Sequence, residues 1–374
     1  MMEPMNPFQY SGPVPEQDVI GRESETAELT GLAAGGHNTR VQAPRRYGKT
    51  SLLRKVLGEA DRQGLRTVYV DLYGVLSRAD IADRIERSYG RIGGRFRNAV
   101  RSALKEVQIT VSTPLGGVGA TAAPGSGDLA LMRLLDMPEI LHRRDGILTV
   151  VVFDEFQDLL RTEGQTDGLM RSVIQHHAHE AGYIFAGSQP GMMHELFDDR
   201  ARAFYSQARP FDLGPLPIGA TADALVERFE RHGKDAGTPI DPLLGFTRGH
   251  PQRTMQLAHH LFALTPPRGM ADEQTWVDAL GRAYAHAEPE LRQAWDALED
   301  VEQRVIAAVA ESRSLLATTT LDRFKLAKST AQSARDRLLR DGQLLAAGER
   351  GPFITDPLLA AWVAAGRRAP ELET

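Results

Sequence analysis

The apolar residues of positions 19–216 follow two alternating patterns. Short, nearly continuous apolar runs are typical of strands buried on both faces of a parallel sheet. Segments with apolar residues every three or four positions indicate helices instead. The continuous run is 147–153, other strand-like segments lie at Val41, 66–72, 182–188 and 211–213, and helical segments occur at 25–32, 52–57 and 81–89. This alternation predicts an α/β fold with a parallel sheet.

The pattern changes after position 217. Helical stripes cover most of 220–290, and three further helices are expected at 301–309, 321–326 and 329–339, the last capped by Ser329. A hairpin is expected after them, over 344–354. Three helices and a hairpin are the pattern of a winged helix-turn-helix. We therefore expect an extended arm (1–18), an α/β core (19–216), a helical lid (217–290) and a winged helix (291–374).

An insertion at 91–128 interrupts the α/β core. It begins with a basic helical stretch, and a Gly/Ala/Thr/Pro-rich stretch follows at 113–127. Between them Val107, Ile109 and Val111 alternate with polar residues, which suggests a short strand or hairpin. Either the insertion is a solvated helix with a mobile loop, or it contacts a partner.

Residues 43–50 fit the phosphate-binding pattern G-x-x-x-x-G-K-[ST], except that Ala43 replaces the first glycine. Gly48 lets the backbone approach a phosphate without a Cβ in the way, and the following helix N-terminus attracts the anion. Lys49 would reach the β- and γ-phosphates, and Thr50 would place its hydroxyl on Mg²⁺. The alternative is an ordinary helix start with an incidental Gly-Lys-Thr.

Two acids end the apolar run at 147–153. A carboxylate at the tip of such a strand lies beside the phosphate loop in this architecture. Asp154 could hold Mg²⁺, and Glu155 could polarise an attacking water. Ser188, at the tip of a later strand, could hydrogen-bond that water or the γ-phosphate, or it could be an ordinary turn serine. Together with the loop, these acids favour nucleotide hydrolysis over a chance match.

Arg253 is the candidate for a further phosphate contact. It follows Gly249-His250-Pro251 in the first turn of an amphipathic helix, and Arg248 before that turn is the competing candidate. A charge-assisted contact from Arg253 to the γ-phosphate would make Arg253→Ala weaken ATP more than ADP. The alternative is a surface arginine without a role in the site.

Composition excludes several classes of function. The chain of 374 residues has a formal net charge of −5, so any contact with nucleic acid requires a local basic patch. It has no cysteine, which excludes disulfides, thiolate metal sites and cysteine nucleophiles. Its N-terminus lacks the pattern of a secretory signal, and its apolar runs are too short to span a bilayer. We expect a cytoplasmic protein with no membrane contact.

One local basic patch does occur, in the predicted winged helix. Between positions 313 and 340 basic residues outnumber acids by seven to two. This is the footprint of a DNA-binding domain, and Lys328, Arg335 and Arg337 are the candidates for contact with duplex DNA. The same patch could instead be solvated on a domain that docks on protein.

The order of these motifs resembles the archaeal-type P-loop ATPases of the STAND group, relatives of the origin-recognition and helicase-loader AAA+ ATPases. The resemblance spans nearly the whole chain and rests on Asn6-Pro7-Phe8, Pro13-Val14-Pro15, Val19 to Glu23, Ala43 to Leu53, Phe153 to Gln157, Ala186-Gly187-Ser188, Gly249-His250-Pro251, Asp356-Pro357-Leu358 and Trp362. It implies a P-loop ATPase core with a helical lid and a winged helix. It also implies ATP with Mg²⁺, a nucleotide-driven switch, and self-association or a protein partner.

The resemblance also implies which residues bind the nucleotide. They are Val19, Ile20, Gly21 and Arg22 on the adenine side, Pro44, Arg45, Arg46, Tyr47, Gly48, Lys49, Thr50 and Ser51 in the phosphate loop, and Pro251 in the lid. The family often has Gly-Arg-Ala before the last strand, whereas this chain has Ser206-Gln207-Ala208 there. An arginine finger would then be Arg200, Arg202 or Arg209, or it would be missing.

The alternatives to an ATPase switch are an ATP-regulated DNA-binding protein with little turnover, and a protein-interaction scaffold.

Overall fold

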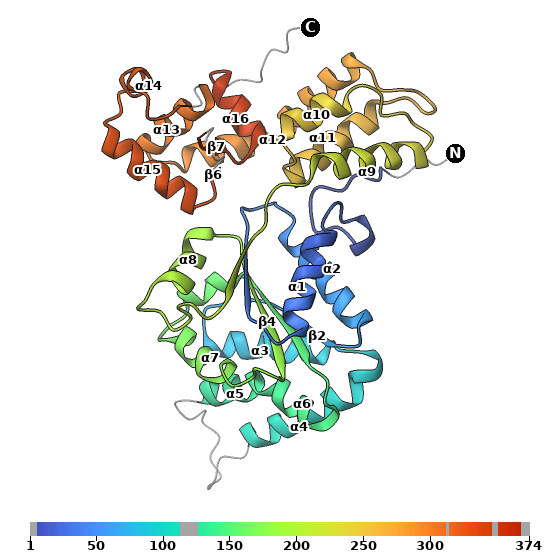
Figure 1. Cartoon of the computed structure of the whole chain (residues 1–374), viewed down its shortest axis with the longest axis vertical. Helices are drawn as coiled ribbons and strands as arrows, with labels where there is room; N and C mark the ends of the chain where they lie inside the picture. Colours follow the sequence, from blue (N-terminus) through green and yellow to red (C-terminus); the bar gives the residue numbers. More distant parts are fainter. Residues whose placement is uncertain (1–5, 113–125, 312–313, 346–350, 368–374) are drawn as a thin grey trace. The chain divides into compact units, whose positions relative to one another are not determined.

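The chain folds into two compact units. The computed structural model describes residues 6–112, 126–311, 314–345 and 351–367 (Figure 1). The sheet unit comprises Glu23–Ala43 and Lys49–Leu213, and the helical unit comprises Met1–Arg22, Pro44–Gly48 and Gly214–Thr374. Most of the Gly-rich stretch at 113–127, the turn of the predicted hairpin and Arg313 of the basic patch lie outside the described residues.

Five parallel strands form the core of the sheet unit. They are β1 (Thr39–Gln42), β2 (Arg66–Asp71), β3 (Thr149–Asp154), β4 (Ala181–Gly187) and β5 (Arg209–Asp212), in the order β2-β3-β4-β1-β5. All neighbours in this order are parallel, so all five strands end at one edge of the sheet. The α/β fold and each of its five predicted strands are confirmed.

Different helices cover the two faces of this sheet. Helices α1 (Glu23–Ala34) and α2 (Lys49–Arg62) pack together on one face. Gly182 of β4 permits this packing, because a Cβ at that position would lie 2.0 Å from the backbone oxygen of Ala33. Alternate strand residues point to the opposite face, where Phe153 and Tyr183 join one apolar core with α3 (Arg78–Gly90), α4 (Arg97–Ser112), α5 (Ser126–Leu135), α6 (Met137–Asp145), α7 (Thr166–Ile174) and α8 (Pro190–Asp198).

The structure corrects one predicted element of the sheet unit. Val107, Ile109 and Val111 belong to helix α4, and not to a strand or hairpin. Val100, Ala103 and Val107 are buried in the core, and their spacing of three and four residues is that of one helix face. The period-two alternation was therefore a coincidence within a helical pattern. Two short 3₁₀ helices, η2 (Gly94–Phe96) and η3 (Phe156–Arg161), also lie in the described part of this unit.

The helical unit contains the predicted helices after position 217. They are α9 (Ile218–Arg231), α10 (Ile240–Thr247), α11 (Pro251–Leu264) and α12 (Glu273–Asp296). Phe8 of the N-terminal arm is buried among them, with its ring 5.4 Å from that of Phe229 and 5.8 Å from that of Phe262. The arm, which ends with η1 (Glu16–Asp18), therefore contributes to the core of this unit.

The last part of the helical unit contains three helices and a two-stranded ladder, and its second helix lies three residues earlier than predicted. These elements are α13 (Asp300–Glu311), α14 (Thr318–Arg323), α15 (Lys328–Arg340), and the antiparallel β6 (Leu344–Leu345) and β7 (Phe353–Ile354), before α16 (Pro357–Ala364). Ser329 does not cap α15, because the helix begins one residue earlier with Ala327 as its N-cap. The assignment of a winged helix stays a prediction. Within the described residues, none of the helices has the length and apolarity that crossing a membrane would require.

Candidate functional site

Lys49 and the acids at the tip of β3 meet at the carboxyl edge of the sheet. Lys49 is the first residue of α2, and its buried ammonium group contacts Asp154 Oδ1 and lies 3.3 Å from Glu155 Oε1. The hydroxyl of Thr50 donates to Asp154 Oδ2 over 3.1 Å. The structure thus brings together four of the predicted site residues, two from each motif. The ammonium group of Lys49 compensates two adjacent carboxylates that would otherwise repel each other.

Glu155 is held by two side-chain donors. The hydroxyl of Ser188 and the amide of Gln157 each donate to Glu155 Oε2 over 2.6 Å. The backbone of Glu155 turns into the left-handed region, at φ 52°, as the chain leaves β3. Because both donors bind the same oxygen, the carboxylate has a fixed orientation. A fixed carboxylate with one partly exposed edge is a suitable general base.

Two residues of this cluster were not predicted from the sequence. The hydroxyl of Tyr69 donates to Asp154 Oδ2 over 2.6 Å, and Tyr69 lies opposite Val152 in the pairing of β2 with β3. Burial and the nearby charge of Asp154 raise the pKa of Tyr69, which keeps this hydroxyl protonated. Gln157 is the other residue. Both stood in segments already identified, Tyr69 on the strand beside β3 and Gln157 just after its acids, but neither belongs to the pattern from which the site residues were predicted.

The phosphate-loop residues before Lys49 belong to the helical unit. Gly48 has a φ of 79°, which favours glycine. The ring of Tyr47 packs edge-on against His250, at 4.9 Å between centroids, and a Cβ on Gly48 would lie 4.0 Å from Pro251. The loop therefore contacts the Gly-His-Pro turn. Pro44 is buried, Arg45 is exposed, and Ser51, just inside α2, is buried.

Arg46 extends from the loop toward α12. Its backbone also lies in the left-handed region, at φ 71°, and its guanidinium group forms an ion pair with Glu290. Both side chains remain partly exposed. Exposed ion pairs contribute little stability, so this pair adds little to the stability of the loop.

The predicted adenine-side residues lie in the helical unit as well. Ile20 belongs to the apolar core of that unit, and Gly21 has a φ of 60° next to the ring of Pro217. Arg22 is buried, and its guanidinium group donates to the carbonyl of Gly214 over 2.6 Å. Val19 precedes them at the end of η1. The turn is therefore fixed by its own packing, and its proposed contact with adenine stays a prediction.

Arg253 occupies a place different from the one expected. The residue is 1% exposed, and its Nε lies 3.1 Å from both carboxylate oxygens of Asp356, the N-cap residue of α16. The same guanidinium group donates to Gln256 over 2.8 Å and to Glu290 over 3.2 Å. The guanidinium group that was expected to contact the γ-phosphate is therefore bound to these protein acceptors in this structure. Arg248, the competing candidate, lies over the ring of Phe353.

The residues predicted to contact DNA are partly neutralised. Arg335 pairs with Asp336 over 2.7 Å. Arg337 is 3.1 Å from Glu299 and 3.2 Å from Glu302. Lys328, at the start of α15, is exposed. The finger candidates Arg202 and Arg209 pair with Glu195 and Glu28, and no role is assigned to them.

Part of the chain matches a known family. Residues 17–83, which include the phosphate loop, match a family described as an AAA-like domain. No curated protein sequence matches the chain.

Solved structures resemble the chain over almost its whole length. The Walker-type ATPase paby2304 of Pyrococcus abyssi has a TM-score of 0.67 at 16% identity, covering 95% of this chain and 99% of that one. The ORC2 protein of Aeropyrum pernix in its ADPNP-ADP complexes has a TM-score of 0.57 at 16% identity, covering 95% and 94%. The ADP form of that protein gives 0.53 at 15% identity, covering 96% and 98%. Likeness at this identity shows the fold alone, and that fold is the α/β fold of these proteins.

Proposed function

We propose that the chain binds and hydrolyses ATP and acts as a molecular switch, whose nucleotide state controls a C-terminal winged helix acting on DNA or on a protein partner. The observation that carries this proposal is the cluster of Lys49, Thr50, Asp154 and Glu155 at the carboxyl edge of the sheet. ADPNP and ADP in the structures of the Aeropyrum pernix ORC2 protein, which has the same fold, support a nucleotide here.

The residues at this edge fit Mg²⁺. Magnesium prefers oxygen ligands, and the Asp154 carboxylate lies within hydrogen-bond distance of the Thr50 hydroxyl. These two residues would hold the ion, with Tyr69 orienting the carboxylate. When bound, Mg²⁺ would neutralise charge on the β- and γ-phosphates.

For the domain organisation, our proposal stays the one expected from the sequence: an extended arm, an α/β core, a helical lid and a winged helix.

The chain's own residues have distinct tasks in hydrolysis. Lys49 would exchange its contacts with Asp154 and Glu155 for the phosphates, leaving the Glu155 carboxylate free to accept a proton from water. Ser188 and Gln157 would keep that carboxylate oriented. Residues 44–48 run directly into α2, and their N–H groups would surround the phosphates.

Two substitutions test this proposal. Lys49→Ala removes the phosphate contact and is expected to weaken ATP binding strongly. Glu155→Gln keeps the shape of the side chain but removes the base, so binding should persist while turnover falls about 10²- to 10⁴-fold. Equilibrium nucleotide titration and single-turnover hydrolysis measure the two effects separately.

Matched controls are available nearby. Lys55→Ala removes a cation from the same helix, where it pairs with Glu23, and Glu163→Gln neutralises an exposed acid. Both controls should leave ATP binding and turnover unchanged. Unchanged ATP affinity in Lys49→Ala would refute the nucleotide site, and equal loss of binding and turnover in Glu155→Gln would remove that residue from the role of base.

A further inference from the structure

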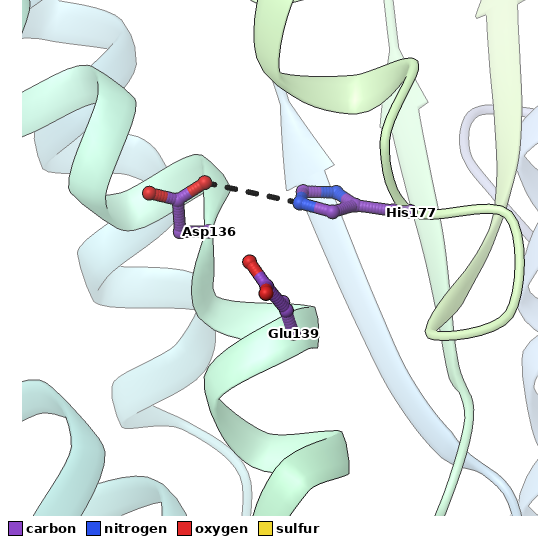
Figure 2. A group of neighbouring side chains, drawn as sticks. All are labelled: Asp136, Glu139 and His177. Carbon is purple, nitrogen blue, oxygen red and sulfur yellow. Dashed lines mark ion pairs between the residues drawn. The ribbon is translucent and has the colours of Figure 1, made fainter.

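A second group of polar side chains lies in the sheet unit, apart from the carboxyl edge. Asp136 precedes α6 and Glu139 lies in its first turn, while His177 follows α7. One potential ligand atom from each residue lies within 4.8 Å of the other two. Figure 2 shows the carboxylates of Asp136 and Glu139 and the ring of His177 around a common space.

The imidazole of His177 is fixed with one nitrogen directed into this space. Its side chain is buried, at 2% exposure for the residue, although histidine is often half-exposed. Nδ1 and the hydroxyl of Tyr183 share a hydrogen bond of 2.7 Å. Nε2 faces Asp136 Oδ1 at 3.8 Å (Figure 2), which is too long for a hydrogen bond. Within the described residues, Nε2 has no closer partner.

The two carboxylates also keep oxygens available. Asp136 stands at the N-cap of α6 but makes no capping hydrogen bond, although this is the usual use of an aspartate there. Its contact with Arg133 is 4.0 Å long. Glu139 uses one oxygen, Oε1, for the guanidinium group of Arg143. Each acid can therefore offer an oxygen to a ligand in the common space.

We propose that Asp136, Glu139 and His177 bind one divalent transition-metal cation, with Zn²⁺ as the expected ion. One imidazole nitrogen and two carboxylate oxygens suit zinc, whose sites with three protein ligands take water in the fourth position. An imidazole ligand disfavours Mg²⁺ and Ca²⁺, which prefer oxygen alone. Nδ1 then carries the proton and donates it to the oxygen of Tyr183, as the second nitrogen of a metal-bound histidine commonly does.

The position of this site assigns it a structural role. His177 lies four residues before the first residue of β4, and its carbonyl accepts from the N–H of Ala181. The site is therefore at the amino edge of the sheet, opposite Asp154 at the carboxyl end of β3. A cation here ties the start of α6 to the connection between α7 and β4. It would stabilise the sheet unit without entering hydrolysis, so the inference is independent of the proposed function.

Zinc titration of the full chain tests the site. The protein is stripped with chelator, and Zn²⁺ binding is measured by calorimetry without nucleotide, in an Asp154→Asn background that removes a carboxylate from the other edge. Co²⁺ absorption in parallel reports the coordination. We expect one tight equivalent and a Tm raised by several degrees. Asp136→Asn and Glu139→Gln should each weaken Zn²⁺ at least tenfold and abolish the rise in Tm.

The controls are the flanking histidines. His176→Ala and His179→Ala remove exposed imidazoles on either side of His177 and should leave Zn²⁺ affinity unchanged. Glu139→Gln alters a half-buried side chain on a helix surface, so it provides the test even if Asp136→Asn fails to fold. Absence of a tight equivalent, or an affinity that falls with His176→Ala and not with Glu139→Gln, would overturn the proposal. His177 would then be only a buried histidine that shares a hydrogen bond with Tyr183.

Discussion

His250 is a buried histidine that must remain neutral at Nδ1 to accept a hydrogen bond. Its Nδ1 accepts the N–H of Arg253 over 3.3 Å and so caps α11, while its ring packs against Tyr47. Burial lowers the pKa of His250 to about 4. The unfolded chain would protonate this side chain near pH 6.5. Between these two values the unfolded state binds more protons, so stability rises with pH.

This linkage gives a prediction for His250→Asn. From pH 6.5 to 5, the wild-type chain should lose about 1.6 kcal/mol through His250, or roughly 3–6 °C in Tm. Asparagine keeps a capping acceptor without a titrating ring. The free energy of unfolding of the variant should therefore fall less over this pH range, by the amount that His250 contributes in the wild type. Thermal unfolding of both proteins at pH 5, 6.5 and 7.5 provides the comparison.

His260 serves as the internal control for this measurement. Burial also lowers the pKa of His260 to about 4, and both proteins retain it, so some acid sensitivity should persist in His250→Asn. Identical pH dependence of the two proteins would show that His250 is not held neutral by the fold.

At the level of residues, the sequence predicted which side chains of the two motifs meet, but it did not predict the ion-pair partners of Arg253. Lys49 and Asp154 belong to motifs with fixed places in a parallel sheet, and the structure brings them into contact. Arg253 has no such constraint. Its partners Asp356 and Glu290 are 103 and 37 residues away along the chain, and only the packing of three helices places them together. No local sequence pattern predicts that an arginine in the first turn of a helix is buried.

At the level of elements, the pairing of Arg253 with Asp356 joins α11 to α16. Burial alone would raise the pKa of Asp356, but the charge and hydrogen bonds of Arg253 outweigh it and hold that pKa below its ordinary value. Removing one partner of a buried ion pair costs about 3–5 kcal/mol, because the other charge is left uncompensated. This ion pair therefore fixes α11, which begins at the Gly-His-Pro turn, to α16.

Arg253→Gln tests this fastening against a role in phosphate binding. We expect the Tm to fall by roughly 10 °C and the affinities for ATP and ADP to change by the same factor. The double variant Arg253→Gln/Asp356→Asn should recover part of the Tm, since asparagine can still cap α16 without an uncompensated charge. Selective weakening of ATP with an unchanged Tm would restore Arg253 as the γ-phosphate contact.

Element prediction succeeded where the period of the apolar pattern was unambiguous. The continuous run that became β3 is buried at every position, and no helical face has that pattern. Residues 107–111 fitted periods of two and four equally well, and the buried face of α4 decided the outcome. The residues of the zinc site were not predicted because they lie on separate elements and share no motif.

At the level of the whole molecule, charge limits how the chain can meet DNA. The net charge of −5 supplies no general attraction, and ion pairs with acids already occupy Arg335, Arg337 and Arg323. The exposed bases Lys325, Lys328 and Arg340 make no ion pair within the described residues. Roughly three cations are therefore free to replace counterions on phosphates.

Duplex binding should accordingly depend only moderately on salt. With about three phosphates neutralised, the slope of log K against log salt concentration is expected to be near −3. Lys328→Ala should reduce the slope by about 1, whereas Arg337→Ala should change it little, because Glu299 and Glu302 already hold that guanidinium group. Arg282→Ala, an exposed site on α12, is the control. A slope of about −6 would mean that the ion pairs break on binding. Absence of binding at low salt, with ATP or without it, would favour a protein partner for this part of the chain.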